Sequence, residues 1–159
     1  MALSPDAAIL AIAYGHGPPI LWDAVSGARL NILGDHSDNV WVVAFSPDGA
    51  TLLSNYDDHA VRLWNTASGV TTKVLEEGRN VNSAIYSPDG NMIATGSDFV
   101  ITLWNARDGL QLFSIFLARD LSGCKLVFSP DSAFISTILY QDLTGGGFRS
   151  LIRLWDVTS

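Results

Sequence analysis

The sequence contains only one cysteine, Cys124, and no Asn-x-Ser/Thr motif. A single cysteine cannot form a disulfide within the chain, and N-glycosylation requires the missing motif. Both absences favour a reducing compartment, so we expect an intracellular protein, cytoplasmic or nuclear. Cys124 is expected to be a small strand residue, because free cysteines usually pack as small apolar side chains.

Charged residues are also scarce, at 16% of the 159 residues, whereas a typical soluble domain has about 25%. The 9 Lys+Arg and 16 Asp+Glu give a net charge of −7, and 48% of the residues are hydrophobic. This composition favours one folded domain over a disordered chain. Nine cations in an acidic chain supply no clustered basic surface, so we expect no nucleic-acid partner.

Long apolar runs are absent. The longest one, residues 7–14, is much shorter than the ~18 residues that a membrane helix needs. Asp6 precedes this run at a place where a signal peptide carries Lys or Arg. We therefore expect neither a membrane partner nor secretion.

The sequence does contain a repeat. Four Ser-Pro-Asp motifs are spaced 42, 41 and 42 residues apart, beginning at Ser4, Ser46, Ser87 and Ser129. Four of the five tryptophans lie between Leu and Asp or Asn, with spacings of 42, 40 and 51 residues, at Trp22, Trp64, Trp104 and Trp155. A period near forty that ends in Trp-Asp is typical of propellers built from four-stranded blades.

The second repeat shows how one unit should fold. Val40–Phe45 is a continuous β-favouring run, as expected for an inner strand buried on both faces. Residues 46–49 form a turn in which Pro fixes φ and Gly closes the turn. Further strands are predicted at residues 51–55, 60–64 and 70–75, with a polar turn at 56–59. No helical period is visible, so the sequence predicts an all-β fold.

These motifs resemble the WD-repeat family of β-propellers, and the resemblance covers essentially the whole chain. It implies an incomplete propeller of about four blades, each a four-stranded antiparallel sheet, in a single region with units at 1–33, 34–77, 78–119 and 120–159. The first and last units are expected to be incomplete. The resemblance implies that the chain is part of a larger propeller, as a fragment of a fungal-type repeat protein, and that additional blades or self-association complete it.

The resemblance also implies a structural hydrogen-bond network within a blade. In the second unit it would join His36, Ser54, Asp58 and Trp64. The third unit has a partial set, Thr95, Asp98 and Trp104. In the first, Ile12 replaces the hydroxyl. In the fourth, residues 141–150, which include the glycines at 145–147, are expected to form an inserted loop outside the strand ladder.

Catalysis and metal binding are weaker interpretations of these residues. Ser54, His36 and Asp58 have the residue types of a catalytic triad, but Ser54 is predicted to lie on a strand inside a blade. The three histidines, at 16, 36 and 59, lack the spacing of a metal site. The triple glycine lacks the Gly-Lys-Ser/Thr of a phosphate loop. We therefore expect no enzyme activity, no cofactor and no metal.

The favoured function is a non-catalytic protein-interaction scaffold that binds other proteins or peptides through the turns on one side of the blades. The alternative is an enzyme or small-ligand binder that uses the central channel of a completed ring. Tyr56 and Phe99 are predicted to be exposed aromatic anchors. The full candidate face consists of Asp35, Asp38, Tyr56, Asp57, His59, Arg79, Asn80, Phe99, Arg119 and Asp120, with the loop at 141–150.

Overall fold

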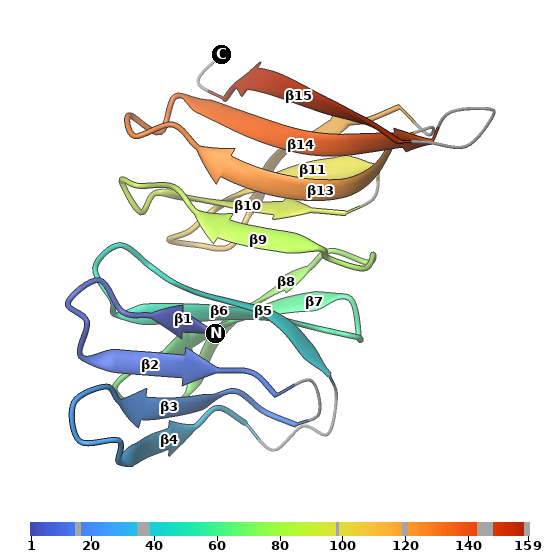
Figure 1. The fold of residues 1–159 in the computed structure, drawn as a ribbon. Helices are drawn as coiled ribbons and strands as arrows, with labels where there is room; N and C mark the ends of the chain where they lie inside the picture. Colours follow the sequence, from blue (N-terminus) through green and yellow to red (C-terminus); the bar gives the residue numbers. More distant parts are fainter. Residues whose placement is uncertain (15–16, 35–38, 98, 119–120, 143–147, 158–159) are drawn as a thin grey trace. The chain divides into compact units, whose positions relative to one another are not determined.

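A computed structural model describes residues 1–14, 17–34, 39–97, 99–118, 121–142 and 148–157, and the side chains of 121–124, 142 and 148 are not described. Within these ranges the chain is all-β, with fifteen strands and no helix (Figure 1). The first sheet consists of β1 (Ala2–Leu3), β2 (Ile9–Ile12), β3 (Ile20–Asp23) and β4 (Arg29–Ile32). The second consists of β5 (Val40–Phe45), β6 (Thr51–Tyr56), β7 (Ala60–Asn65) and β8 (Thr71–Glu76).

The third sheet consists of β9 (Ser83–Tyr86), β10 (Met92–Gly96), β11 (Val100–Asn105) and β12 (Gln111–Phe116). The fourth has three strands in the described residues, β13 (Leu121–Phe128), β14 (Phe134–Asp142) and β15 (Phe148–Asp156). In every sheet the strands pair antiparallel in chain order. The predicted fold class is confirmed, and the strands of the second repeat lie within one residue of their predicted bounds.

The predicted loop at 141–150 is wrong at both of its ends. Gln141 pairs with Arg149 and Tyr140 with Ser150, so β14 and β15 are nine-residue strands of one long hairpin (Figure 1). The extra residues of the fourth unit therefore lengthen the hairpin, since each added residue on one strand gains a partner on the other. Residues 143–147, which include the triple glycine, lie outside the described residues.

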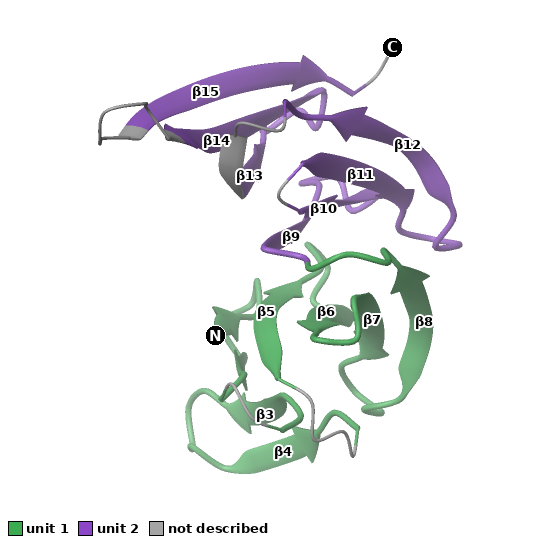
Figure 2. Cartoon of the chain, turned by 90° about the vertical axis from the view of Figure 1, so that its right-hand side faces the viewer, with its two compact units in different colours: residues 1–80 green, residues 81–159 purple. Residues whose placement is uncertain are grey.

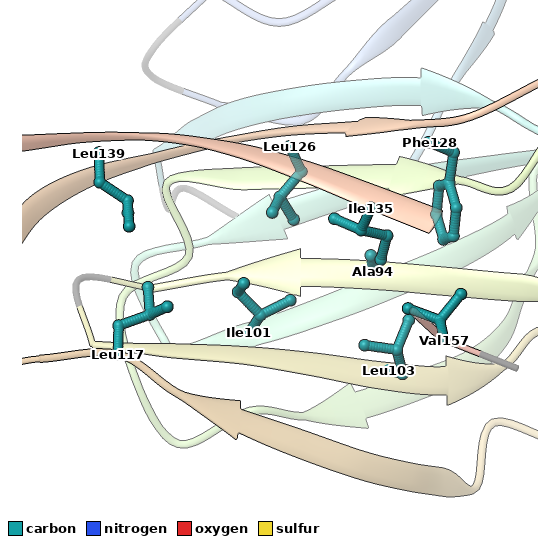
Figure 3. Packing of buried hydrophobic residues seen from close by; sticks show 9 residues of the cluster. All are labelled: Ala94, Ile101, Leu103, Leu117, Leu126, Phe128, Ile135, Leu139 and Val157. Atoms are coloured by element: carbon teal, nitrogen blue, oxygen red, sulfur yellow. The ribbon is translucent and has the colours of Figure 1, made fainter. Parts of the chain in front are cut away.

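The chain divides into two compact units, residues 1–80 and 81–159, each with two sheets (Figure 2). The core of the first unit joins residues of the first two sheets, among them Ala11, Leu21, Leu52, Tyr56 and Trp64. The core of the second unit joins the third and fourth sheets in the same way (Figure 3). Its buried members are Ala94, Ile101, Leu103, Leu117, Leu126, Phe128, Ile135, Leu139 and Val157.

Both cores follow one stacking rule, which can be read from the strand registers. Residues that oppose each other across an antiparallel pair share a face of the sheet, and neighbours along a strand lie on opposite faces. In the second unit, Leu103 lies on the face of its sheet opposite Trp104 and packs with Ile135, which shares a face with Trp155.

The first unit is built alike, because Leu21, opposite Trp22, packs with Leu52 on the face of Trp64. In each unit, then, the Trp-bearing face of the later sheet covers the opposite face of the earlier one.

The fourth sheet leaves such an opposite face open. Four large apolar residues lie on the side away from Trp155, as the strand register shows: Val127 opposes Ser136, Tyr140 opposes Ser150, Ile152 opposes Ile138 and Leu154 opposes Ser136. Their exposed fractions are 56%, 43%, 74% and 66%. We call these four residues the open face of β13–β15.

Candidate functional site

The Ser-Pro-Asp turns have the same geometry in all four sheets. The Ser46 hydroxyl donates to Asp48 Oδ1 at 2.5 Å, and Asp48 Oδ1 also accepts from the backbone N–H of Ala50. Ser46 Oγ in turn accepts from Thr51 N–H, the first residue of the next strand. The same three bonds recur in the turns that begin at Ser4, Ser87 and Ser129.

The serine hydroxyls lower the pKa of the aspartates in these turns. The donated hydroxyl bond from Ser46 is the main cause of the lowered pKa of Asp48, followed by the Ala50 N–H. For Asp89 the Ser87 hydroxyl is again the main cause. The pKa of Asp6 and that of Asp131 are lowered in the same way. Because hydrogen bonds to the charged form favour it, these carboxylates belong to the structure of the turn.

The Trp-bearing faces carry a repeated bond from indole to hydroxyl. Trp64 Nε1 donates to Ser54 Oγ at 2.8 Å, and Trp104 Nε1 donates to Thr95 Oγ1 at 2.9 Å. Each hydroxyl lies two residues along the neighbouring strand from the residue that opposes the tryptophan.

Among the described residues, the first sheet lacks this indole–hydroxyl bond and the fourth sheet has it. At the equivalent place in the first sheet is Ile12, and the buried Trp22 Nε1 has no hydrogen-bond partner among the described residues. Trp155 Nε1 donates to Thr137 Oγ1 at 3.3 Å, a pair that the sequence interpretation missed. Its signal was available, because Thr137 lies on the strand that precedes the Trp155 strand.

The rest of the predicted network is described only in part. Asp58 accepts from Ala60 N–H and forms an ion pair with Arg62, four residues along the chain. His36 and Asp98 lie outside the described residues, so their roles stay predictions. What the structure adds is Arg62, whose guanidinium also lies 4.5 Å from the centre of the Tyr56 ring.

The residues weighed above as a catalytic triad or a metal site show no such site where the structure describes them. The side chain of Ser54 is fully buried, and its hydroxyl accepts the indole N–H of Trp64, so it is closed to a substrate in this conformation. The described residues hold no group of three or more His, Cys, Asp or Glu that could bind a metal ion. His59 is exposed in the turn before β7, whereas His16 and the side chain of Cys124 are not described.

The candidate partner face needs one correction. Tyr56 was predicted to be an exposed anchor, but it is only 2% exposed, because it opposes Val40 and points into the core of the first unit. Phe99 is 41% exposed. Asp57, His59, Arg79 and Asn80 are exposed as well. Asp35, Asp38, Arg119 and Asp120 lie outside the described residues.

An exposed aromatic side chain that the sequence interpretation missed lies next to Asp57. Trp41, on β5, is 66% exposed, and its Nε1 donates to Asp57 Oδ1 at 2.6 Å. Asn39 Nδ2 donates to the other oxygen, Asp57 Oδ2, at 2.7 Å. We call Asn39, Trp41 and Asp57 the Trp41 platform.

An irregularity in β5 explains why Trp41 is exposed. The register of β5 with β6 shifts between Val40 and Val43, and Val42 N–H donates to Oδ1 of the Asn55 side chain at 2.6 Å. Such a bulge re-aims the side chains around it. Trp41 is the one tryptophan outside the repeated Leu-Trp-Asp/Asn motif, and that departure was the signal available in the sequence.

The comparisons with known proteins point to one family. The family model described as WD domain, G-beta repeat matches residues 27–65 and 69–105. Each matched segment begins two residues before the fourth strand of one sheet and ends with the third strand of the next. A search of curated proteins finds no match. Within the described residues, no helix is long and apolar enough to cross a membrane.

The matched repeats, the antiparallel sheets in chain order and the recurring turns agree with one another. Residues 27–65 and 69–105 are thus repeats of the WD type, and the all-β fold of antiparallel sheets is consistent with an incomplete β-propeller of that type.

Proposed function

We propose that the chain is a non-catalytic protein-interaction scaffold and forms part of a larger propeller. The observation that carries this proposal is the open face of β13–β15. Four large apolar side chains on this one side of the sheet are between 43% and 74% exposed. Contiguous exposed apolar surface in a soluble protein marks a place where another protein surface binds.

The stacking rule specifies the kind of surface that covers this face. In both units, the face opposite the tryptophan packs against the Trp-bearing face of another blade. The open face of β13–β15 is of this kind, so its partner is the Trp-bearing face of a further blade or of a second copy. Turns at the edges of stacked blades remain accessible to other partners.

Light scattering on the purified chain tests this proposal. We expect the wild-type mass to rise with protein concentration, and the double variant Ile152→Glu/Leu154→Glu to associate much more weakly, because it places charges on the open face. The control variant Val25→Glu/Val70→Glu makes the same charge change at two exposed valines, 92% and 61% exposed, outside that face. This control should associate like the wild type.

A monomeric mass for the wild-type chain across the whole concentration range would contradict the proposal. Equal association of the two double variants would contradict it too, because the open face would then not be the contact surface.

A further inference from the structure

We propose that the Trp41 platform binds an arginine side chain in a basic segment of a partner protein. This inference rests on the proposed scaffold function and adds a site and a partner chemistry to it. The site consists of one exposed aromatic ring and one carboxylate, held together by the hydrogen bonds described above.

The Trp41 ring is held in place before any partner arrives. Its N–H is fixed by Asp57 Oδ1, and Asp57 is fixed in turn by the Asn39 amide through Oδ2. Ordering a free side chain on binding costs conformational entropy, and a side chain already held avoids much of that cost. Tryptophan is also among the residues that most often dominate interface energy. The exposed ring is therefore a prepared contact surface.

The charge next to the ring is not neutralised within the described residues. Both hydrogen bonds to Asp57 come from neutral donors, an indole and an amide. The cation closest in sequence, Arg62, pairs with Asp58 instead. Among the described residues no cation pairs with the Asp57 carboxylate, which lies at the edge of the Trp41 ring.

This combination selects a cation, and a guanidinium in particular. The negative face of an indole attracts cations more strongly than other aromatic side chains do. A planar guanidinium stacks on a ring and still directs N–H donors toward a carboxylate, whereas an ammonium has no flat face. The net charge of −7 also favours a basic partner over an anionic one such as a nucleic acid.

Short peptides serve as probes for this site. We would compare a glycine-arginine peptide with peptides of the same length in which lysine or citrulline replaces arginine. Citrulline keeps the shape of arginine but has no charge. Acrylamide quenching of tryptophan fluorescence reports mainly on Trp41, because Trp64 and Trp104 are 2% and 5% exposed and Trp22 and Trp155 are only partly exposed.

We expect the arginine peptide to protect Trp41 from acrylamide, with binding that weakens as salt is added. The citrulline peptide should bind at least about tenfold more weakly, since the cation is lost. The lysine peptide should lie between the two. Equal affinity for the citrulline peptide would overturn the proposal, and equal affinity for the lysine peptide would overturn the assignment to arginine.

Calorimetric titrations of variants place the binding on the platform. Trp41→Leu removes the ring, and Asp57→Asn removes the charge but keeps an oxygen that can accept the indole N–H. Each should weaken the arginine peptide about tenfold. The controls are Phe116→Leu, at an aromatic residue on β12 that is 75% exposed and lies outside the candidate face, and Glu76→Gln, an equal charge change on β8. Both should bind like the wild type, and circular dichroism should show all four variants folded.

Loss of binding in the controls as well would overturn the assignment to the platform. The light-scattering test remains separate, because it concerns the open face of β13–β15. If the chain self-associates through that face but does not bind the arginine peptide, the scaffold proposal is supported and only the arginine site is contradicted.

Discussion

Ala7 occupies a backbone conformation that usually belongs to glycine. It follows Asp6 in the first Ser-Pro-Asp turn with φ of 59°, where the second and third turns have Gly49 and Gly90 at 71° and 74°. A left-handed conformation costs a residue with a Cβ atom roughly 1–2 kcal/mol. We therefore expect Ala7→Gly to raise the free energy of unfolding by about 1 kcal/mol in urea denaturation.

The neighbouring alanine is the control for this variant. Ala8 is also exposed but has no positive φ, so Ala8→Gly should lower stability by roughly 0.5 kcal/mol. Stabilities that change equally in the two variants would show that the left-handed conformation carries no strain at Ala7.

Ser54 contributes through the hydrogen bond that it accepts. Ser54→Ala should lower the free energy of unfolding by about 1–3 kcal/mol, because the buried indole N–H of Trp64 loses its acceptor. Chemical denaturation measures this loss. Ser68→Ala is the control, because Ser68 lies in an exposed turn and should change stability by less than about 0.5 kcal/mol. If both variants lose the same free energy of unfolding, the hydrogen bond from Trp64 to Ser54 makes no particular contribution to stability.

The surroundings of a single residue could be predicted from the sequence where that residue belongs to the repeated motif. The tryptophans of the repeat could be placed because the strand period fixes the face on which each one lies. Trp41 and Tyr56 could not, because one depends on a strand bulge and the other on packing between two sheets. Trp41 lies outside the repeated Leu-Trp-Asp/Asn motif, but that departure does not locate the bulge, and the packing of Tyr56 has no local sequence pattern.

The Ser-Pro-Asp turns, as elements, make stability depend on pH. The folded pKa values of Asp48 and Asp89 lie below the ordinary value of 3.8, because serine hydroxyls bond their carboxylates. A lowered folded pKa contributes stability that is fully present above the ordinary pKa and is lost as the pH falls through the folded value. We therefore expect the urea midpoint to fall as the pH drops from about 5 to below the ordinary carboxylate pKa.

The double variant Asp48→Asn/Asp89→Asn tests this source of the pH dependence. It should be less stable than the wild type at pH 7 and should lose less stability on acidification. Parallel pH profiles for the two proteins would show that other carboxylates are responsible.

The element that sequence reasoning misjudged is the β14–β15 hairpin. Spacing alone showed that Ser129 and Trp155 are 26 residues apart, whereas Ser46 and Trp64 are 18 apart. An insertion of this size can form a loop or lengthen both strands equally, and the two results have the same spacing. Pairing between strands decides which one forms, and that is a tertiary property.

At the scale of the whole molecule, a substitution in one of the two cores should destabilise mainly the unit that contains that core. Leu21 and Leu103 are both 0% exposed, one in the core of residues 1–80 and the other in that of residues 81–159. Leu21→Ala and Leu103→Ala should each cost about 2–5 kcal/mol, because each leaves a cavity. Hydrogen exchange should then show faster exchange chiefly in the unit that carries the substitution.

A uniform increase in exchange along the chain after either substitution would contradict two separate cores. It would show one cooperative unit instead. At this scale the sequence predicted most of the fold, since a period near forty residues requires repeated sheets. It could not predict how the sheets group into compact units, because that depends on contacts between repeats.

Three of the four turns begin with a buried serine, and this burial has a consequence for covalent modification. The Ser46 and Ser87 side chains are 6% and 0% exposed, and their hydroxyls already donate to Asp48 and Asp89. A phosphoryl group there would bring a dianion against a carboxylate and remove the hydrogen bond that the serine hydroxyl donates to it. Kinases therefore meet these hydroxyls only in an unfolded chain, and a chain phosphorylated before folding would be unable to close the turns that begin its second strands.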